Sequence, residues 1–355
     1  MGLGGATVAA FGLSAIGSIF VPTFFALVLT ICAQPIRRGL ERRGIPRGLA
    51  TGSVILATTL LLLGFGAALS IAVAQFATLL PQYAPELQDW VAGIGDWLSS
   101  LGIGEEQVQH ILSGFDPTAL VGFLSGLLGN ATSLLAAFVV LLTMLILMAM
   151  DSGYGPTLLG QLRPRKPALV AAVTRFTSGV RRYMVVTTLL GVAQGLVNWI
   201  ALVILGVPGA LLWGLLAFLC SFIPNIGYFI ALIPPLIFGG LVGGWPTVIA
   251  VIVVYGIINA VIQSIIQPKV VGNAVALSQT LTFFSVLFWA VVLGPMGAIL
   301  AIPLSLLVRM LFVDSNPQVA WMLPAIGELD ETKRIMDDED AAAKEERQRR
   351  RHPSP

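Results

Sequence analysis

The sequence predicts an all-α, polytopic integral membrane protein with about eight to ten transmembrane or re-entrant helices, since one spanning helix needs about 20 apolar residues. The composition is 56% hydrophobic and only 11% charged, with a mean hydropathy of +0.90, whereas a soluble domain carries about 25% charged residues. The charges are also segregated along the chain. Five tracts contain no Asp, Glu, Lys, Arg or His: 1–36, 48–85, 117–150, 184–268 and 270–308.

The composition of these tracts favours helices over membrane strands. The run Leu134–Met150 is apolar on every side, whereas a membrane strand alternates between apolar and polar residues. Pro22 divides the first 36 residues into two stretches, each slightly short of a full span, which we interpret as two short passes. Further passes are predicted at about 49–80, 131–150, 185–205, 209–222, 227–243, 246–267, 280–293 and 296–312.

The charged loops predict the orientation in the membrane. The loop 34–47 has five arginines and one glutamate, a net charge of +4, and the stretch 151–183 has a net charge of +5. The intervening region 77–130 has six acidic residues and no lysine or arginine. Because basic residues near helix ends stay in the cytoplasm, we expect the two basic loops inside and the acidic region outside. The C-terminus is then cytoplasmic, and so is the N-terminus.

These assignments divide the chain into four parts. They are N-terminal transmembrane helices with a basic loop (1–76), an acidic extracytoplasmic helical segment (77–130), a main transmembrane domain with the cytoplasmic basic segment 151–183 (131–312), and a cytoplasmic charged tail (313–355). Within the second part, apolar residues recur three and four apart over 86–101, which predicts an amphipathic helix. It is either an interfacial helix anchored by Trp90 and Trp97 or a gate over an external vestibule.

The motifs of several enzyme classes are missing. The sequence has no HExxH, no P-loop with its lysine and no GxSxG, and its two histidines lie in the external segment and the tail. The cysteines Cys32 and Cys220 both fall in apolar tracts and behave there as small hydrophobes. We therefore expect no enzymatic activity, no cofactor, no metal site and no disulfide. The basic residues border apolar tracts and do not form a nucleic-acid-binding surface.

Helix breakers and amides interrupt the apolar tracts. Pro224, Asn225 and Gly227 separate two apolar runs, and backbone groups freed at membrane depth are tolerated only where protein or a water-filled cavity satisfies them. Three further amides, Asn259, Gln263 and Gln267, share one helical face, while Gln194 and Asn198 form a similar pair. Such amides either join helices or contact a solute, and the pattern leaves both interpretations open.

The chain resembles the autoinducer-2 exporter-like family of bacterial permeases from the loop at Pro35 to about Phe312. The likeness rests on Pro35-Ile-Arg-Arg, Leu205-Gly-Val-Pro, Phe222-Ile-Pro-Asn-Ile-Gly, Gln267-Pro-Lys-Val-Val-Gly, Leu293-Gly-Pro-Met-Gly and Ile302-Pro303. The resemblance implies a homo-oligomeric protein of the bacterial inner membrane. Members have been associated with export of autoinducer-2 and, in other cases, with sodium/proton exchange. Two departures affect the substrate assignment: Gln263-Ser264 replaces a common acidic residue followed by asparagine, and Gln279 replaces a frequent proline.

The leading expectation is a permease that exports a small polar solute, with the bilayer as its surroundings. Its substrate-binding residues are predicted to be Pro224, Asn225, Gly227, Asn259, Gln263, Gln267 and Asn198. A sodium/proton-type antiporter is one alternative, although proton coupling generally uses an intramembrane carboxylate. Only Asp151, at the inner end of a predicted helix, is a candidate for that coupling role. The other alternative is a non-transporting oligomeric scaffold, in which the amides only join subunits.

Overall fold

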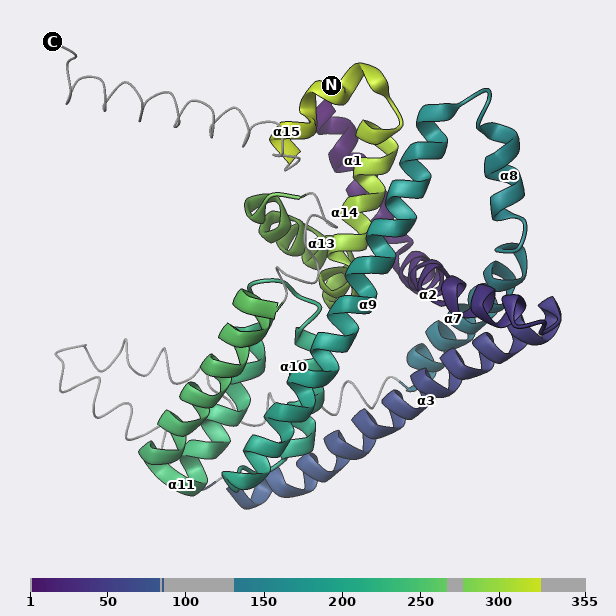
Figure 1. The fold of residues 1–355 in the computed structure, drawn as a ribbon. Coiled ribbons are helices and arrows are strands. Elements are labelled where there is room, and N and C mark those ends of the chain that lie inside the picture. Colours follow the sequence, from purple (N-terminus) through teal and green to yellow (C-terminus); the bar gives the residue numbers. More distant parts are fainter. Residues whose placement is uncertain (1, 84, 86–130, 267–276, 327–355) are drawn as a thin grey trace, which may run out of the picture.

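The computed structural model describes residues 2–83, 85, 131–266 and 277–326, and all regular structure in these ranges is helical (Figure 1). Five of the described helices are long and apolar enough to cross a membrane. A sixth span is formed if the bent pair Leu135–Asp151 and Gly155–Leu162 is counted as one. The predicted all-α, multi-pass architecture is confirmed. The amphipathic segment 86–101 and Gln267 lie outside the described residues.

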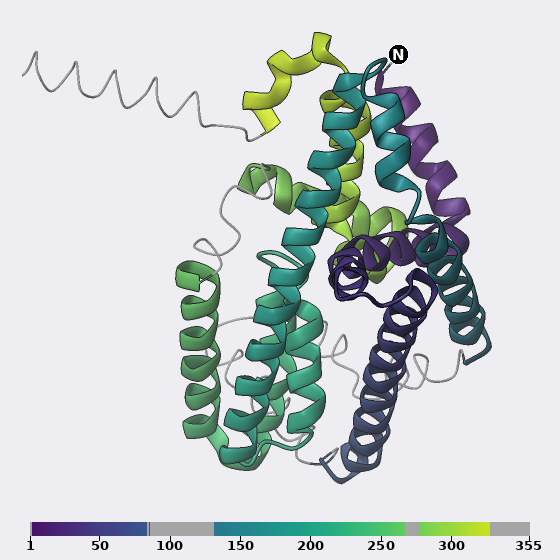
Figure 2. The same ribbon diagram turned by 45° about the vertical axis from the view of Figure 1, so that its right-hand side comes forward.

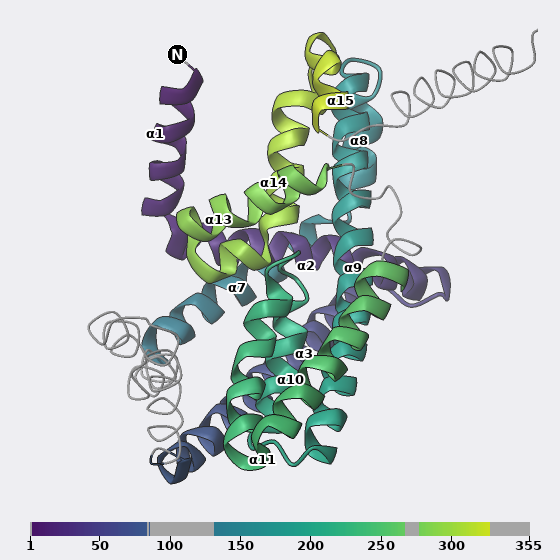
Figure 3. The same cartoon turned by 90° about the vertical axis from the view of Figure 1, so that its left-hand side faces the viewer.

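The first two helices meet at a break that the sequence placed elsewhere. Helix α1 covers Gly2–Ala15 and α2 covers Gly17–Arg42, and they join at Ile16. Figure 3 shows the two axes turned sharply away from each other. Pro22 lies inside α2, so the predicted division at Pro22 is wrong. The missing N–H of Pro22 removes one helical hydrogen bond, but Phe24 and Val28 in the next turns are buried in the core and hold α2 together.

The next helices follow the prediction closely. Helix α3 covers Arg47–Leu79 and is followed by a 3₁₀ turn, Leu80–Tyr83. Helix α7 covers Ala131–Asp151 and α8 covers Gly155–Leu162. α7 packs on α2 and α3, and Leu141 and Leu145 of α7 are buried against Ala26 of α2. The passes predicted at 49–80 and 131–150 are therefore both helices.

Helix α9 is the longest helix described, and α10, α11 and α14 pack against it. It covers Pro167–Ile204, 38 residues, a length of about 57 Å at a rise of about 1.5 Å per residue. The last part of the predicted basic segment, 167–183, and the pass predicted at 185–205 are thus parts of one continuous helix. α10 covers only Ala210–Cys220, about 16 Å. The pass predicted at 209–222 is therefore too short to cross about 30 Å of hydrocarbon by itself.

The chain reverses direction inside two helices, α11 and α13, at a glycine with non-helical backbone angles. Helix α11 covers Gly227–Asn259, but Gly244 has a φ of +61° and separates two arms. A Cβ placed on Gly239 would lie 3.4 Å from Val251 Cγ2, so the arms run antiparallel. A π-helix, Ala260–Ile266, extends the second arm. Gly294, with a φ of +72°, divides α13, Gln279–Ile299, in the same way.

The chain then continues beyond the boundary at 312 predicted from the sequence. Helix α14 covers Ala301–Arg309 and passes into a π-helix, Met310–Asp314, a 3₁₀ helix, Pro317–Met322, and the short helix α15, Leu323–Ile326. Val313 is buried, and the backbone N–H of Ser278 donates to the carbonyl of Ile326 at 2.9 Å. This part of the predicted tail is therefore tied to the helical domain.

Besides the cluster around α7, two buried clusters form the core, one along each half of α9. One joins α2, the first half of α9, α13 and α14 around Val28, Val180 and Ile302. The other joins the second half of α9 to α10 and α11 around Leu202, Phe238 and Tyr255. Figure 2 shows the teal α9 beside the green arms of α11, with the C-terminal helices at the opposite end of α9. The second cluster holds together the helices that carry Asn198 and Asn259, whereas Phe222, Ile223 and Ile226 around the predicted break pack in the first cluster.

Candidate solute site between helices α9, α10 and α11

The break predicted at Pro224–Gly227 is a tight turn between α10 and α11. Asn225 has a φ of +65°, a left-handed conformation that asparagine tolerates better than most residues. The N–H of Ile226 donates to the carbonyl of Pro224 at 2.8 Å and closes a three-residue turn. Asn225 is exposed, whereas Gly227 is buried against the carbonyl of Cys220. The turn thus presents its one amide side chain outward.

The same turn is fastened to α9. The buried hydroxyl of Tyr183 donates to the carbonyl of Phe222 at 3.2 Å. This contact satisfies a backbone acceptor that the interruption of the helix leaves free, as a buried polar group in a membrane protein requires. The start of α11 also lies beside its end, because the Tyr228 hydroxyl is 3.9 Å from the position of a Cβ on Gly256. Asn259 follows Gly256 by one turn, so the structure brings it to the same end of the hairpin as the turn.

Glycines allow α9 and α10 to approach closely. A Cβ on Gly195 would lie 2.7 Å from the carbonyl oxygen of Gly214, and a Cβ on Gly214 would lie 2.7 Å from Trp199 Cβ. Such distances are too short for any side chain, as in other small-residue helix interfaces in membranes. The contact fixes which face of α9 meets α10. Gln194 and Asn198, on adjacent turns of α9, are both buried.

Asn198 is fully buried and has no hydrogen-bond partner among the residues that the structure describes. Its exposed fraction is 0%, and neither Oδ1 nor Nδ2 is hydrogen-bonded. Burial of an unpaired amide costs free energy, about 1–3 kcal/mol by mutational measures. The Tyr255 hydroxyl and Asn259 Oδ1 on α11 are likewise buried without a partner. With the Thr187 hydroxyl on α9, four residues of the helices that form the second core cluster carry buried polar atoms without a partner in the part of the chain that the structure describes.

The remaining predicted residues are Gln263, Gln267 and Pro224. Gln263 is half-buried in the π-helix 260–266, a type of helix that is frequent at functional sites. Gln267 lies outside the described residues. Pro224 is half-buried and shapes the turn without offering a donor. The structure thus brings together Asn225, Asn259 and Gly227 near one level, with Asn198 deeper in the bundle.

The carboxylate considered for coupling lies at the end of a helix, as the sequence predicts. Asp151 is exposed at the last residue of α7. A second carboxylate, Asp314, falls in the predicted cytoplasmic tail, but its side chain is only 5% exposed. Asp314 Oδ1 lies 3.0 Å from Arg175 Nη1 and 3.4 Å from Arg309 Nε. The sequence signal that could have indicated it is Arg309, a cation at the end of an apolar tract with an acid five residues later.

Metal binding has no basis in the described residues. Within the ranges that the structure describes, no three His, Cys, Asp or Glu side chains gather closely enough to hold an ion. Cys32 and Cys220 are free thiols on different helices, the first half-buried and the second buried. The polar groups available for a ligand in the bundle are therefore neutral amides and a phenol. Such groups can donate and accept hydrogen bonds with an uncharged solute.

Comparison with known proteins identifies relatives over most of the chain. The model of the AI-2E family transporter matches residues 3–314. The AI-2 transport protein TqsA of Escherichia coli (strain K12) is 30% identical over 302 residues, covering 84% of this chain and 86% of that protein. The putative transport protein YhhT of the same organism is 27% identical, covering 83% and 84%. A putative transport protein of Haemophilus influenzae is 26% identical, covering 91% and 94%.

Proposed function

Because the chain belongs to the AI-2E family of transporters, we propose that it exports a small polar solute, uncharged or weakly charged, through the bundle of α9, α10 and α11. The chain is a multi-pass membrane protein, and its named relatives are transport proteins. The observation that carries the proposal is Asn198, an amide with 0% exposure and no partner on either polar atom.

The unpaired amide supports a solute path over simple helix joining. An amide that joins helices in a membrane does so through a hydrogen bond across the interface. Asn198 lies at such an interface but makes no bond with any described residue. The Asn198 amide therefore does not stabilise the contact between α9 and α10. The free-energy cost of burying it is offset only if another molecule forms a hydrogen bond with it during the transport cycle. A polar solute that passes between the helices would supply that pairing.

The path that we propose runs from the turn at Asn225 into the bundle. Gly191, which meets Ser221 at the turn, precedes Asn198 by seven residues, about 10 Å along the helix axis. In the conformation described, glycine contacts between α9 and α10 close this route beside Asn198. Passage therefore requires α10 to separate from α9. The short α10 is bounded by turns at both ends, which are the positions where a helix can hinge.

Two alternatives have less support from the described residues. Proton-coupled exchange generally uses a carboxylate inside the membrane, but Asp151 is exposed and Asp314 is neutralised by two arginines. A scaffold would use the amides as contacts, and Asn198 makes none. Export of autoinducer-2 itself is suggested only by the name of the TqsA relative. The outward direction and the homo-oligomer expected from the family resemblance belong to the same proposal.

Flux from reconstituted vesicles tests the proposal. Vesicles containing the full chain are loaded with a panel of labelled solutes that includes autoinducer-2, small polyols and sugars, with and without a proton or sodium gradient. Release of at least one neutral solute without a gradient is expected. The variant Asn198→Val should slow that release about tenfold, the value of one lost hydrogen bond of about 1.4 kcal/mol.

A matched variant controls for general damage to α9. Thr188→Val also replaces a polar side chain of α9, but the Thr188 hydroxyl already donates to the carbonyl of Met184 at 2.7 Å. Its flux should stay within twofold of the unmodified protein. Equal flux in Asn198→Val and the unmodified chain would remove Asn198 from the site. Absence of release for every solute, with and without gradients, would contradict solute export as a whole.

A further inference from the structure

The turn between α2 and α3 encloses a hollow unrelated to the bundle of α9, α10 and α11. α2 ends at Arg42 and α3 begins at Arg47. The N–H of Gly44 donates to the carbonyl of Glu41 at 3.0 Å, and the N–H of Ile45 donates to the carbonyl of Leu40 at 3.2 Å. These bonds hold the turn around an open hollow of about 440 Å³. Its lining residues are Arg38, Glu41, Arg42, Gly44, Ile45, Pro46 and Arg47.

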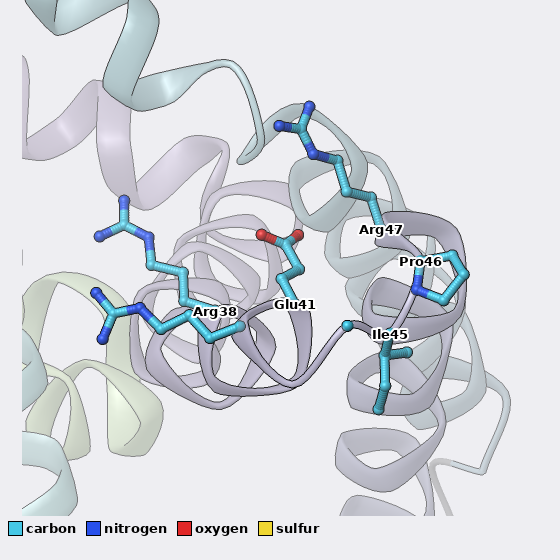
Figure 4. A pocket seen from close by; sticks show the side chains of 7 residues that line it. Arg38, Glu41, Ile45, Pro46 and Arg47 are labelled. Atoms are coloured by element: carbon cyan, nitrogen blue, oxygen red, sulfur yellow. The ribbon is translucent and has the colours of Figure 1, made fainter.

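The hollow has an excess of positive charge. Three arginines and one glutamate line it, which leaves a net charge of +2. Figure 4 shows Arg38 on one side and Arg47 on the other, with Glu41 between them. The charge of Glu41 is already offset by a residue outside the hollow, because Glu41 Oε1 lies 3.2 Å from Arg37 Nε. The three lining guanidinium groups are exposed and have no acidic partner among the described side chains.

Arg37, which lies outside the hollow, differs from the arginines that line it because its guanidinium group is hydrogen-bonded to the protein. It is the buried neighbour of Arg38 and donates to the carbonyl of Ala149 at 3.0 Å and to the hydroxyl of Ser152. Arg37 thus caps the C-terminal end of α7, where a cation is favourable. Arg38, Arg42 and Arg47 make no comparable contact. A cluster of guanidinium groups without protein partners around a concave surface is suited to a bidentate anion such as phosphate.

Apolar surface adjoins the hollow on both helices. Ile36 is 62% exposed and Leu49 is 67% exposed. Beyond them, α3 continues as a long apolar helix whose spanning window is almost unburied. The hollow therefore lies at the boundary between a charged turn and two apolar helices. In a membrane protein this boundary is at the level of the lipid phosphates. A free anion would use the arginines but gain nothing from the adjacent apolar side chains.

We propose that this hollow binds the phosphate of an anionic phospholipid, with the arginine forks on the headgroup and the acyl chains along the exposed apolar faces of α2 and α3. The site would anchor the α2–α3 turn at the membrane surface. It depends on neither the solute nor the direction of transport. Because the charges are exposed, binding should weaken as ionic strength rises and the Debye length falls below about 10 Å.

Native mass spectrometry of the full-length protein in detergent tests the site. The protein is titrated in parallel with phosphatidylglycerol, phosphatidylcholine and inorganic phosphate, and bound lipid is counted from the adduct masses. We expect one tightly bound phosphatidylglycerol per chain and binding of phosphatidylcholine that is at least fivefold weaker. Equal binding of the two lipids would overturn the proposal. Displacement of phosphatidylglycerol by millimolar phosphate would assign the hollow to a soluble anion instead.

Two sets of variants locate the binding. The triple variant R38Q/R42Q/R47Q should weaken the phosphatidylglycerol interaction at least fivefold. The control R163Q/R165Q/K166Q removes the same charge from exposed residues between α8 and α9 and should change it less than twofold. If the triple variant does not fold, R38K/R42K/R47K keeps the charge and loses only the fork geometry, with an expected weakening of about two- to threefold. Equal effects of the test and control triplets would contradict a specific site.

Discussion

Near one end of α9 the charged side chains are paired, whereas near the other end several buried polar groups have no hydrogen-bond partner among the described residues. At the first end, Arg181 donates to the carbonyl of Ile31 and to Gln34, both at 3.3 Å, and Asp314 lies between two arginines. At the second end, Asn198 is buried without a hydrogen bond. Satisfied polar groups hold helices in fixed positions, whereas unsatisfied ones cost stability. The first region is therefore built to stay in place, and the second retains polarity for a purpose other than stability.

Removal of a partner from the satisfied region should have the largest effect. Asp314→Leu removes the buried carboxylate that lies 3.4 Å from Arg309 Nε, so the guanidinium of Arg309, whose side chain is 5% exposed, loses this ion pair. The expected loss is about 3–5 kcal/mol of folding free energy, seen as a lower midpoint of thermal or denaturant unfolding in detergent. The double variant R309M/D314L removes both charges and should recover most of the loss. Unfolding of Asp314→Leu at the midpoint of the unmodified protein would show that the network contributes nothing.

The opposite sign is expected in the unsatisfied region. Asn198→Val removes an amide that has no partner and replaces it with an apolar side chain between packed helices. The unfolding midpoint should rise, by an amount that corresponds to about 1–3 kcal/mol, because the desolvation cost of the amide disappears. The flux experiment predicts that the same variant is slower. A fall in stability would show that Asn198 is hydrogen-bonded in the folded protein. The two ends of α9 would then not differ in whether their buried polar groups have partners.

The sequence predicted the helices well because apolar tracts and charged loops report directly on membrane spans. It also located the turn at Pro224–Gly227, since proline and glycine act on the backbone locally. It placed the first break at Pro22 instead of Ile16, because packing of Phe24 and Val28 outweighs one lost hydrogen bond. The length of α10 depends on the approach of α9, which is a tertiary property.

The candidate site was only partly predictable for the same reason. Amide residue types at Asn198 and Asn259 are visible in the sequence, but the absence of a partner for Asn198 is not. The prediction places Asp314 in the tail because the last predicted pass ends at about 312. Its ion pair with Arg175 joins residues 139 positions apart and is not visible in the sequence. The arginines of the α2–α3 turn predict only the orientation of the chain in the membrane, because the sequence does not show that they surround a hollow.

The turn at Asn225 allows a backbone role to be separated from a solute role. Asn225→Val forces a β-branched residue into φ +65° and should cost about 1–2 kcal/mol of stability. Asn225→Gly tolerates that φ and should leave the unfolding midpoint unchanged. If Asn225 only shapes the turn, the glycine variant keeps full flux; if its amide contacts the solute, flux falls although stability does not. Equal stability of the two variants would contradict the left-handed turn.

The smallest effect is expected at the exposed edge of the satisfied region. Arg175 contacts the same carboxylate oxygen as Arg309, at 3.0 Å against 3.4 Å, but its side chain is 55% exposed whereas that of Arg309 is 5% exposed. Water and salt screen an exposed charge, so Arg175→Gln should cost less than about 1 kcal/mol, and the difference should shrink further in high salt. Arg309→Gln should cost more at every salt concentration, since it leaves Asp314 buried with only the exposed partner. Equal costs for the two variants would mean that distance, and not burial, determines how strongly this end of α9 is held.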